Sequence, residues 1–340
     1  MFTGRIKIKK ADRRISKKIG GKKIGEGAYG AVYSPPLYCE NGSEKDFLSE
    51  NFVSKILSVK AANIELANSK IIRSMDPEGR WSITAENWCH LKIEQTNANF
   101  MKNKATRKNL YDKKNGSDLV QIIFKNGGQT IMSLLEKSDV NNTDDYEWSN
   151  LPLIIQISKN LITVLSSLNQ THVHGDLHFK NIVWNGSEAH IIDFGLMENI
   201  HDMKSDTTHE LWHCLRHSSE HNNKKFIKIL KTLTKDTTVI KEISLLLDDK
   251  LANPEDIKEV TKPIIRDAFR RIDVERLFIN LRNIFENEGC KTAFPGIYDY
   301  FLFTQPMTYE DYVNLILRIP IVEPTRKNEE RHEFTNYYYT

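Results

Sequence analysis

The stretch HVHGDLHFKNIVW, from His172 to Trp184, decides the fold of this chain, because it encloses a polar loop between two apolar segments. It holds three histidines, one aspartate and one asparagine. Three interpretations are open at this point: a metal-binding cluster of histidines, a polar surface loop, or the chemical centre of an enzyme. The segments on either side of the stretch help to choose between them.

A β-hairpin is predicted directly after the loop. Two short apolar strands, Ile182–Trp184 and 189–192, flank an Asn-Gly pair, which is the strongest short-range signal for a hairpin turn. Because a hairpin returns the chain to its start, Asn181 and Asp193 are expected side by side, with Asp176 in the same loop. Two carboxylates and a carboxamide suit Mg²⁺, which binds through one or two carboxylates together with substrate phosphates. The simpler alternative is a polar turn beside a small hairpin.

Hydrophobic periodicity predicts the elements around this loop. Apolar residues recur at helical spacing from Leu151 to Leu168 and indicate a long, largely buried helix. The chain is strand-like from Lys22 to about Leu57, helical from Ser58 to Arg73, strand-like at 119–124 and mostly helical beyond about Leu196. A mainly-β first third followed by a mainly-α remainder predicts an α+β protein of two lobes. The expected segments are a basic arm (1–20), a first lobe with its joint near Lys125–Gly128 (21–128), a second lobe (129–325) and a tail (326–340).

Residues 24–32, Ile-Gly-Glu-Gly-Ala-Tyr-Gly-Ala-Val, form a glycine-rich loop of the pattern G-x-G-x-x-G-x-V. Such a loop either opens a helix that binds the pyrophosphate of a dinucleotide, or joins two antiparallel strands that cover the phosphates of a nucleotide. The next residues are strand-like and then meet Pro35-Pro36, so no helix is expected to follow. This favours the second mechanism, with a plain hairpin turn as the simpler alternative.

One lysine, Lys55, lies inside the apolar strand Phe52–Leu57. A lysine in such a run either extends from an edge strand or points its ammonium group at nucleotide phosphates and is held there by a carboxylate. Glu65, on the following helix, is the preferred partner, and Glu86 is the alternative.

The motif H-G-D-L-x-x-x-N followed by D-F-G resembles the catalytic loop and metal-binding motif of the protein kinase superfamily. The glycine loop, Lys55 and Glu65 also come in the order of that family, and the resemblance covers about residues 20–200. It implies a bilobal kinase-like fold with a small mainly-β N-lobe and a larger mainly-α C-lobe. It also implies an enzyme that transfers phosphate from ATP, with Mg²⁺, to serine or threonine hydroxyls of protein substrates.

The resemblance implies roles for individual residues. Asp176 would be the catalytic base, Lys55 and Asn181 would assist it, and Asn181 and Asp193 would hold Mg²⁺. Gln121 to Gly127 would form the hinge that contacts adenine. The residues that would bind the nucleotide are Ile24, Gly25, Gly27, Gly30, Val32, Lys55 and Glu65.

Three departures from the family pattern keep alternatives open. Gly175 replaces the arginine of H-R-D, which implies activity without loop phosphorylation. His178 stands where protein kinases usually have a lysine, and H-G-D-L-H also occurs in small-molecule kinases of the aminoglycoside and choline type. No A-P-E motif follows, since His-Ser-Ser-Glu at 217–220 is only a poor match. The alternatives are therefore a small-molecule kinase, or a pseudokinase that serves as a nucleotide-binding scaffold. Asp273 is expected to anchor the catalytic loop from a later helix.

Four histidines recur every fourth residue after D-F-G: His209, His213, His217 and His221. The first two match H-E-x-x-H, the zinc-binding pattern of metalloproteases. The pattern is short, however, and it falls where the kinase interpretation expects the activation segment. A solvated or packing face is therefore expected in place of a zinc site.

The composition of the chain limits which binding partners and which cellular location we expect. The net charge of +3 conceals a basic arm, because Met1–Lys23 is rich in lysine and arginine and carries Asp12 as its one acidic residue. The arm is expected either to bind nucleic acid or an acidic surface, or to form a solvated leader.

No run approaches the roughly 18 apolar residues of a membrane span, and no signal peptide is visible. Four cysteines without a C-x-x-C pair favour reduced thiols. We therefore expect a cytoplasmic protein without a membrane partner. Several strings are similar to divergent kinases of large DNA viruses, which implies the host cytoplasm or the virion.

Overall fold

The computed structural model describes residues 21–26, 30–43, 45–91, 119–136, 148–201, 237–238, 240–241, 262–287, 290 and 308–321. The chain is α+β, as predicted, and divides into two compact units. Unit 1 comprises residues 1–63 and 85–126, and unit 2 comprises residues 64–84 and 127–340. The boundary after Asn126 lies inside the joint expected from the sequence, but residues 64–84, expected in the first lobe, group with unit 2.

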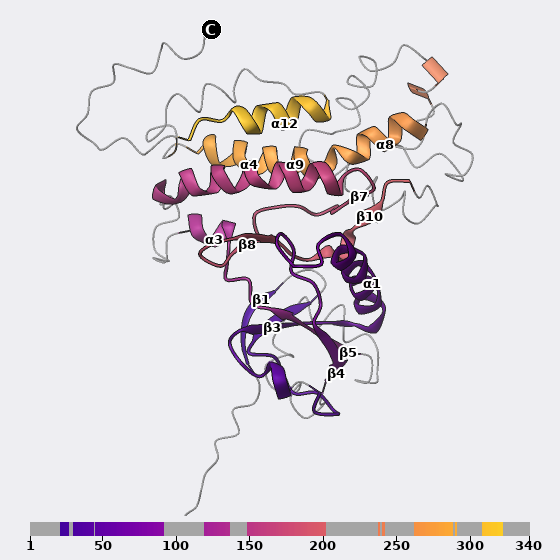
Figure 1. Ribbon diagram of the computed structural model, residues 1–340, viewed down its shortest axis with the longest axis vertical. Coiled ribbons are helices and arrows are strands. Elements are labelled where there is room, and N and C mark those ends of the chain that lie inside the picture. The colour runs from indigo at the N-terminus through magenta and orange to yellow at the C-terminus, as the bar shows by residue number, and fades with distance from the viewer. Residues whose placement is uncertain are drawn as a thin grey trace, which may run out of the picture. The chain divides into compact units, whose positions relative to one another are not determined.

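Unit 1 is built on a five-stranded antiparallel sheet of order β1-β2-β3-β5-β4 (Figure 1). Its second strand alternates buried and half-buried side chains, which is the two-residue period of a strand with one face in a core. That core holds Ala31, Tyr33, Leu37, Ile56 and Leu91. The strands are β1 (Lys22–Glu26), β2 (Ala31–Ser34), β3 (Phe52–Ser58), β4 (Asn87–His90) and β5 (Leu119–Lys125), and a 3-10 turn covers Lys45–Phe47.

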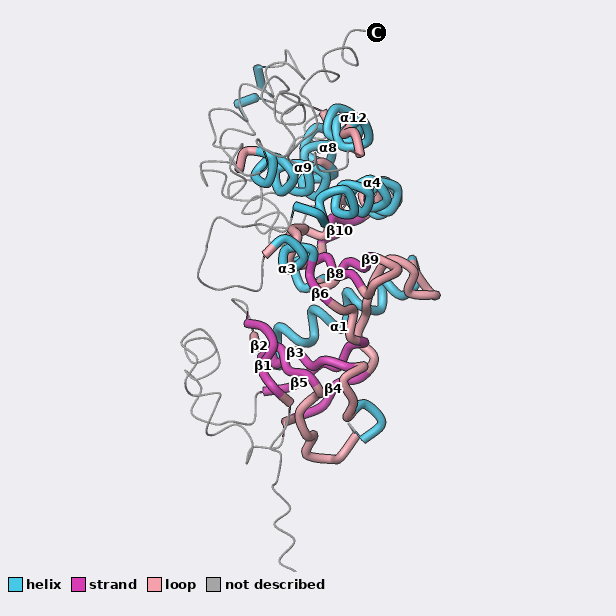
Figure 2. Tube along the Cα trace, turned by 90° about the vertical axis from the view of Figure 1, so that its left-hand side faces the viewer, coloured by secondary structure: helices cyan, strands magenta, loops and turns pink. Residues whose placement is uncertain are grey.

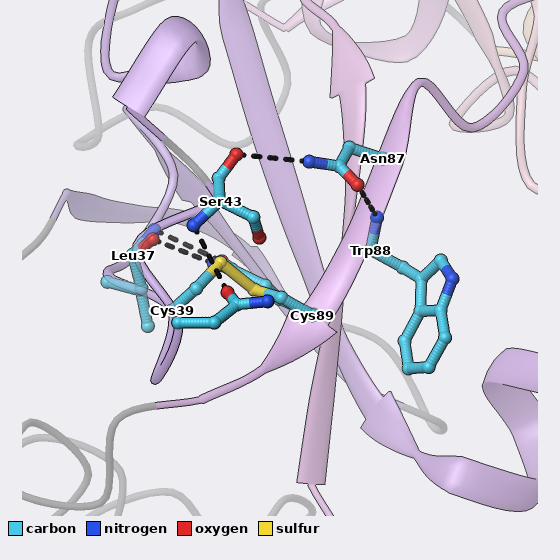
Figure 3. The surroundings of a disulfide bond; sticks show 8 residues. Leu37, Cys39, Ser43, Asn87, Trp88 and Cys89 are labelled. Atoms are coloured by element: carbon cyan, nitrogen blue, oxygen red, sulfur yellow. Dashed lines mark hydrogen bonds between the residues drawn. A yellow bond between two sulfur atoms is a disulfide. The ribbon is translucent and has the colours of Figure 1, made fainter.

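A disulfide between Cys39 and Cys89 corrects the expectation of reduced thiols (Figure 3). The two residues are separated by 50 positions, and both side chains are buried. Cys39 follows β2 and pairs with Leu91 in an isolated bridge, so two distant segments meet edge to edge. The fully buried amide of Gln121 on β5 donates to both sulfur atoms and to the Leu37 carbonyl, and it accepts from the Leu37 N–H group. Sequence spacing alone gave no sign of this pair, because the sheet brings its members together.

Helix α1 (Val59–Met75) begins at the end of unit 1 and continues into unit 2, close to the predicted helix. It ends where the sequence predicts, since the residue before Pro77 is disfavoured in a helix. The buried carboxylate of Asp76 then organises the turn, because it accepts hydrogen bonds from the backbone N–H groups of Arg80, Trp81 and Ser82 and from the Ser82 hydroxyl. This turn leads into an isolated parallel bridge between Ser82 and Ile191.

Three helices form the main core of unit 2. Helix α4 (Leu151–Leu168) has the predicted bounds and buries one apolar stripe against α9 (Ile272–Phe285) and α12 (Tyr309–Arg318). The three run side by side in Figure 1 and are seen nearly end-on in Figure 2. Among the described residues, one segment, Trp148–Leu168, is long and apolar enough to cross a membrane, and it is this core helix.

Small elements of unit 2 surround the polar loop of the opening stretch. Two antiparallel sheets have the orders β6-β8-β9 and β10-β7. The remaining elements are β6 (Gln129–Thr130), α3 (Ile131–Leu135), β7 (His172–Val173), β8 (Ile182–Trp184), β9 (Ala189–Ile191), β10 (Glu198–Asn199), α8 (Lys262–Arg270) and the 3-10 turns Trp148–Asn150 and Phe194–Leu196.

Candidate active site

The predicted hairpin after the loop is confirmed. Strands β8 and β9 pair antiparallel, and Asn185 caps the turn by accepting from the N–H groups of Ser187 and Glu188. The hairpin returns the chain to the loop, since the Ile192 N–H group donates to the carbonyl of Asn181 at 3.0 Å. Asn181 and Ile192, the residue directly before D-F-G, therefore lie next to each other, so the hairpin brings the two ends together as the sequence predicts.

Asp176 and Asn181 are tied together within the loop. The Asn181 Nδ2 atom donates to the backbone carbonyl of Asp176 at 2.9 Å and lies 3.5 Å from its Oδ2 atom. An amide oxygen and a carboxylate, the donor types of Asn181 and Asp193, suit Mg²⁺. Their role as metal ligands stays a prediction.

The carboxylate of Asp176 is held closely at one oxygen and has a more distant neighbour at the other. Arg276 on α9 donates to Oδ1 at 2.8 Å, and the Nε2 atom of His178 lies 3.6 Å from Oδ2. Burial raises the pKa of the Asp176 carboxyl, but the hydrogen bond and charge of His178, the charge of Arg276 and that of His174 together outweigh burial and lower the pKa below its ordinary value. The group is therefore ionised at neutral pH, as a proton acceptor must be.

The histidines of the stretch do not gather around a metal. His174 is fully buried, where its Nε2 atom donates to the carbonyl of Ile192 and its Nδ1 atom accepts from the N–H group of Asp176. Its ring also packs against Phe194. In the part of the chain that the structure describes, no group of three or more His, Cys, Asp or Glu side chains is placed to hold a metal ion. The metal-cluster interpretation is therefore not supported for this loop.

The prediction that Asp273 anchors the loop from a later helix is confirmed. Its fully buried carboxylate accepts from the N–H groups of His174 at 2.7 Å and Gly175 at 3.0 Å, and from the side chain of Asn169 at 2.9 Å. Buried N–H groups need such partners, because an unpaired one costs about 1–3 kcal/mol. Helix α9 thus fixes the backbone that leads into Asp176.

Gly175 has a structural reason to be glycine. Its φ is +76°, in the region that only glycine adopts without strain, and a Cβ atom there would collide with the carbonyl oxygen of Leu196. The loop therefore passes too close to the segment after D-F-G for the arginine of H-R-D. This departure from the family pattern follows from backbone packing.

The D-F-G turn carries a strained residue. Asp193 is the one non-glycine residue with positive φ among those described, at φ 63° and ψ 65°. Such conformations cost of order 1 kcal/mol and cluster at functional sites. Asn68 on α1, which sequence reasoning missed, supports the turn by donating to the carbonyls of Phe194 at 2.7 Å and Met197 at 3.3 Å. Its only signal in the sequence was its place one helical turn after Glu65.

Glu65 belongs to this group. Its side chain is 3% exposed, and its carboxylate lies beside the same turn, since a Cβ atom added to Gly195 would be 3.7 Å from Oε2 of Glu65 and 3.4 Å from Oδ1 of Asp193. The buried carboxylate of Glu65 thus lies next to the D-F-G turn, which the sequence analysis did not foresee. The pairing of Glu65 with Lys55 stays a prediction.

In unit 1 the glycine loop is the predicted hairpin, because β1 pairs antiparallel with β2 and no helix follows. The dinucleotide interpretation, which needs that helix, is therefore wrong. Gly25 is opposite Val32, and Val32 is opposite Lys55, so these three residues, which are predicted to bind the nucleotide, line up across neighbouring strands.

The other predicted nucleotide-binding residues of the loop differ in their surroundings. The side chain of Ile24 is 56% exposed, and Gly27 lies outside the described residues. Gly30 is needed as glycine for packing, since a Cβ atom there would meet the carbonyl of Ile56.

Two further expectations for unit 1 concern the partner of Lys55 and the hinge. Glu86, the alternative partner of Lys55, lies 3.8 Å from the ammonium group of Lys125, and the choice between Glu65 and Glu86 stays open. Within the predicted hinge 121–127, β5 pairs with β3 as far as Lys125 and with β4 as far as Ile123. The contact of this segment with adenine stays a prediction.

Several predicted features lie outside the described residues. They are the arm (1–20), the histidine series 209–221 with the A-P-E candidate 217–220, and the tail (326–340). Neither the protein-family models nor the curated proteins compared with this chain give a match.

Proposed function

We propose that this protein is an ATP- and Mg²⁺-dependent kinase that phosphorylates serine or threonine hydroxyls of protein substrates. The proposal includes the bilobal kinase-like fold implied by the sequence, with unit 1 as the N-lobe and unit 2 as the C-lobe. It rests on the residues described above and on the resemblance of their motifs to the protein kinase superfamily.

The observation that carries the proposal is the convergence of Asp176, Asn181 and the strained Asp193 at the mouth of one hairpin. A polar surface turn needs no such support. Here the loop is held by Asp273 from α9, and the turn by Asn68 from α1. Rigid second-layer hydrogen bonds of this kind are what a catalytic arrangement requires.

The chemistry of phosphoryl transfer fits these groups. The acceptor hydroxyl oxygen forms a bond to the γ-phosphorus of ATP while the bond from that phosphorus to the β,γ-bridging oxygen breaks, which releases ADP. The hydroxyl proton passes to the carboxylate of Asp176. Because positioning and charge neutralisation matter more here than base strength, a carboxylate with a lowered pKa suffices as a late proton acceptor.

The other residues would position ATP and its metal. Asn181 and Asp193 would hold Mg²⁺, which when bound neutralises charge on the β- and γ-phosphates. Lys55 would bind the α- and β-phosphates and pair with Glu65. Gly25, Gly27 and Gly30, with Ile24 and Val32, would cover the phosphates.

A small-molecule acceptor is the second candidate, and His178 is the observation that favours it. Its imidazole lies beside the carboxylate of Asp176 and replaces the lysine usual in protein kinases. A pseudokinase ranks lower, because Lys55, Asp176, Asn181 and Asp193 are all present, whereas scaffolds that have lost catalysis usually lack at least one of them.

The deciding experiment measures transfer of labelled γ-phosphate from ATP to mixed protein substrates by the wild type, Asp176→Asn and Lys55→Met. We expect transfer by the wild type and a loss of at least about 100-fold in each variant. Equal signal in all three would sink the kinase proposal. ATP turnover that depends on a metabolite pool, without labelled protein, would favour the small-molecule candidate. Nucleotide binding without any transfer would favour the scaffold.

The role of the basic arm stays a proposal of its own. If the arm recruits the kinase to nucleic acid, the full chain is retained on immobilised DNA or RNA, retention weakens with added salt, and removal of residues 1–23 abolishes it. Retention that survives the truncation would contradict this role.

A further inference from the structure

Helix α9 contacts the loop through one polar face. Asp273, Arg276 and Asn280 are spaced at i, i+3 and i+7, so they lie on the same side of the helix. Each of the three contacts the loop at a successive point. Asp273 binds the backbone N–H groups of His174 and Gly175. Arg276 binds the side chain of Asp176, and Asn280 accepts from the Phe179 N–H group at 3.5 Å.

This polar face lies on a helix whose apolar side chains are buried. Most of α9 is buried, and its apolar side chains pack in the core of unit 2 with those of α4 and α12. A solvated helix face would not explain Arg276, because its side chain is only 18% exposed. A partly buried guanidinium that donates to a carboxylate at 2.8 Å makes one of the stronger kinds of hydrogen bond in proteins.

The contact engages one oxygen of Asp176 and leaves the other. Arg276 binds Oδ1, whereas the nearest groups to Oδ2 are Nε2 of His178 at 3.6 Å and Nδ2 of Asn181 at 3.5 Å. Both of these distances are too long for strong hydrogen bonds. Oδ2 is therefore the oxygen that retains capacity to accept a proton.

We propose that Arg276 is a positioning residue for phosphoryl transfer: it holds Oδ1 of Asp176, so that Oδ2 faces the acceptor hydroxyl. It also supplies, from α9, a permanent positive charge beside Asp176 at a site where His178 replaces the lysine of the kinase motif. This inference rests on the proposed function, since it assigns a role in that reaction. A guanidinium stays charged across the pH range in which proteins are usually studied.

The plain alternative is that Arg276 stabilises the fold and does nothing else. A structural role changes the amount of folded protein, whereas a positioning role changes the rate of the folded protein. The two roles are separated by measuring kcat, the KM for ATP and the midpoint of urea unfolding on the same samples.

The experiment uses the full chain and four variants in the labelled-ATP assay. Arg276→Gln is expected to lower kcat about 10- to 100-fold with the KM for ATP within about twofold, because the lost charge-assisted hydrogen bond acts on the reacting carboxylate. Arg276→Lys is expected to recover part of that loss. Arg276→Gln combined with His178→Lys is expected to recover activity as well, because a lysine in the loop again brings a cation to Asp176. Arg282→Gln is the matched control, since Arg282 lies on the same helix but pairs with Glu286.

Chemical rescue adds a readout that a structural role would not move. Guanidinium chloride at low millimolar concentration is expected to raise the activity of Arg276→Ala and to leave the wild type unchanged. The inference is overturned if Arg276→Gln transfers phosphate at the wild-type rate, or if its loss only follows the folded fraction and neither lysine nor guanidinium restores it. If the wild type itself transfers no phosphate, the proposed function fails and the role of Arg276 fails with it.

Discussion

The Oδ2 atom of Asp273 lies 2.7 Å from the backbone nitrogen of His174, although the two residues are 99 positions apart in the chain. Through this contact a buried helix holds the loop that carries Asp176. Asp273→Ala would leave the buried N–H groups of His174 and Gly175 without their acceptor. We expect a loss of about 3 kcal/mol or more in the free energy of unfolding, measured by urea denaturation.

A surface carboxylate serves as the control for that substitution. Glu310 is exposed on α12, so Glu310→Ala should change the free energy of unfolding by no more than about 0.5 kcal/mol. Similar values for the two variants would contradict the anchoring role of Asp273.

Introducing at position 175 the arginine of the kinase motif H-R-D is expected to destabilise the protein. At φ +76° any side chain is strained, and the first carbon of that side chain would collide with the carbonyl of Leu196. Gly175→Ala should cost about 2 kcal/mol or more, and Gly175→Arg, which recreates H-R-D, should cost at least as much.

Gly186 offers a matched comparison for Gly175. It also has positive φ, at +104°, but a Cβ atom there would meet nothing within 4 Å. Gly186→Ala therefore carries only the conformational penalty, about 1 kcal/mol. If thermal unfolding shows equal losses for the two alanine variants, close packing against Leu196 is not the reason for glycine at position 175.

The hydrogen bonds from Asn68 are expected to set the stability of the D-F-G turn. Asn68→Ala removes both bonds to the carbonyls of Phe194 and Met197, which should lower the free energy of unfolding by about 1–3 kcal/mol. Asn68→Asp should be worse, because a carboxylate has no N–H group to donate and repels both carbonyl oxygens. An aspartate variant as stable as the wild type in urea denaturation would show that these bonds contribute nothing.

Removing the Cys39–Cys89 disulfide should destabilise unit 1. A cross-link across 50 positions restricts the unfolded chain and contributes about 2–4 kcal/mol. We expect the Cys39→Ala/Cys89→Ala variant, or the wild type with reductant, to unfold at lower urea concentration. Peptide mapping after alkylation provides the direct check: in unfolded protein kept from reductant, Cys39 and Cys89 should stay unmodified. Their alkylation without reduction would disprove the pair.

Cys290 should respond to pH in the alkaline range. Burial raises the pKa of its thiol from 9.0 to about 12. Between those values the unfolded chain has lost a proton that the folded protein keeps, so this group lowers stability as the pH rises above 9. The fall in unfolding free energy from pH 9 to pH 11 should be smaller in Cys290→Ala than in the wild type. A native thiol that reacts with iodoacetamide at pH 8 as fast as the unfolded one would refute its burial.

Local patterns were enough to predict much of this structure. The helical spacing from Leu151 to Leu168 gives the bounds of α4, because an apolar stripe of that length has one way to be buried. The Asn-Gly pair at 185–186 predicts the β8–β9 hairpin, since such pairs favour turns, and in the structure Gly186 takes the positive φ that glycine adopts readily. The same local chemistry brings Asn181 next to Ile192, the residue directly before D-F-G.

Local sequence patterns did not predict contacts between segments that are distant in the chain, with one exception. Asp273 was expected from the family resemblance, which carries information on distant contacts. Arg276 and Asn68 were missed, because an arginine or an asparagine on a helix usually faces solvent and nothing nearby in sequence marks its partner. The cysteines were misjudged for the same reason, since pairing depends on the sheet that places Cys39 beside Cys89.

The sequence by itself determined the motifs around Asp176, Asn181 and Asp193 on which the proposed function rests, because each motif is short and lies within one turn of the chain. It also determined the α+β order of the elements, since hydrophobic period is a local property of the chain. Only the tertiary structure decided how the carboxylate of Asp176 is held. Its partner, Arg276, lies 100 positions away and meets it because packing of α9 in the core of unit 2 sets a polar face of that helix against the loop.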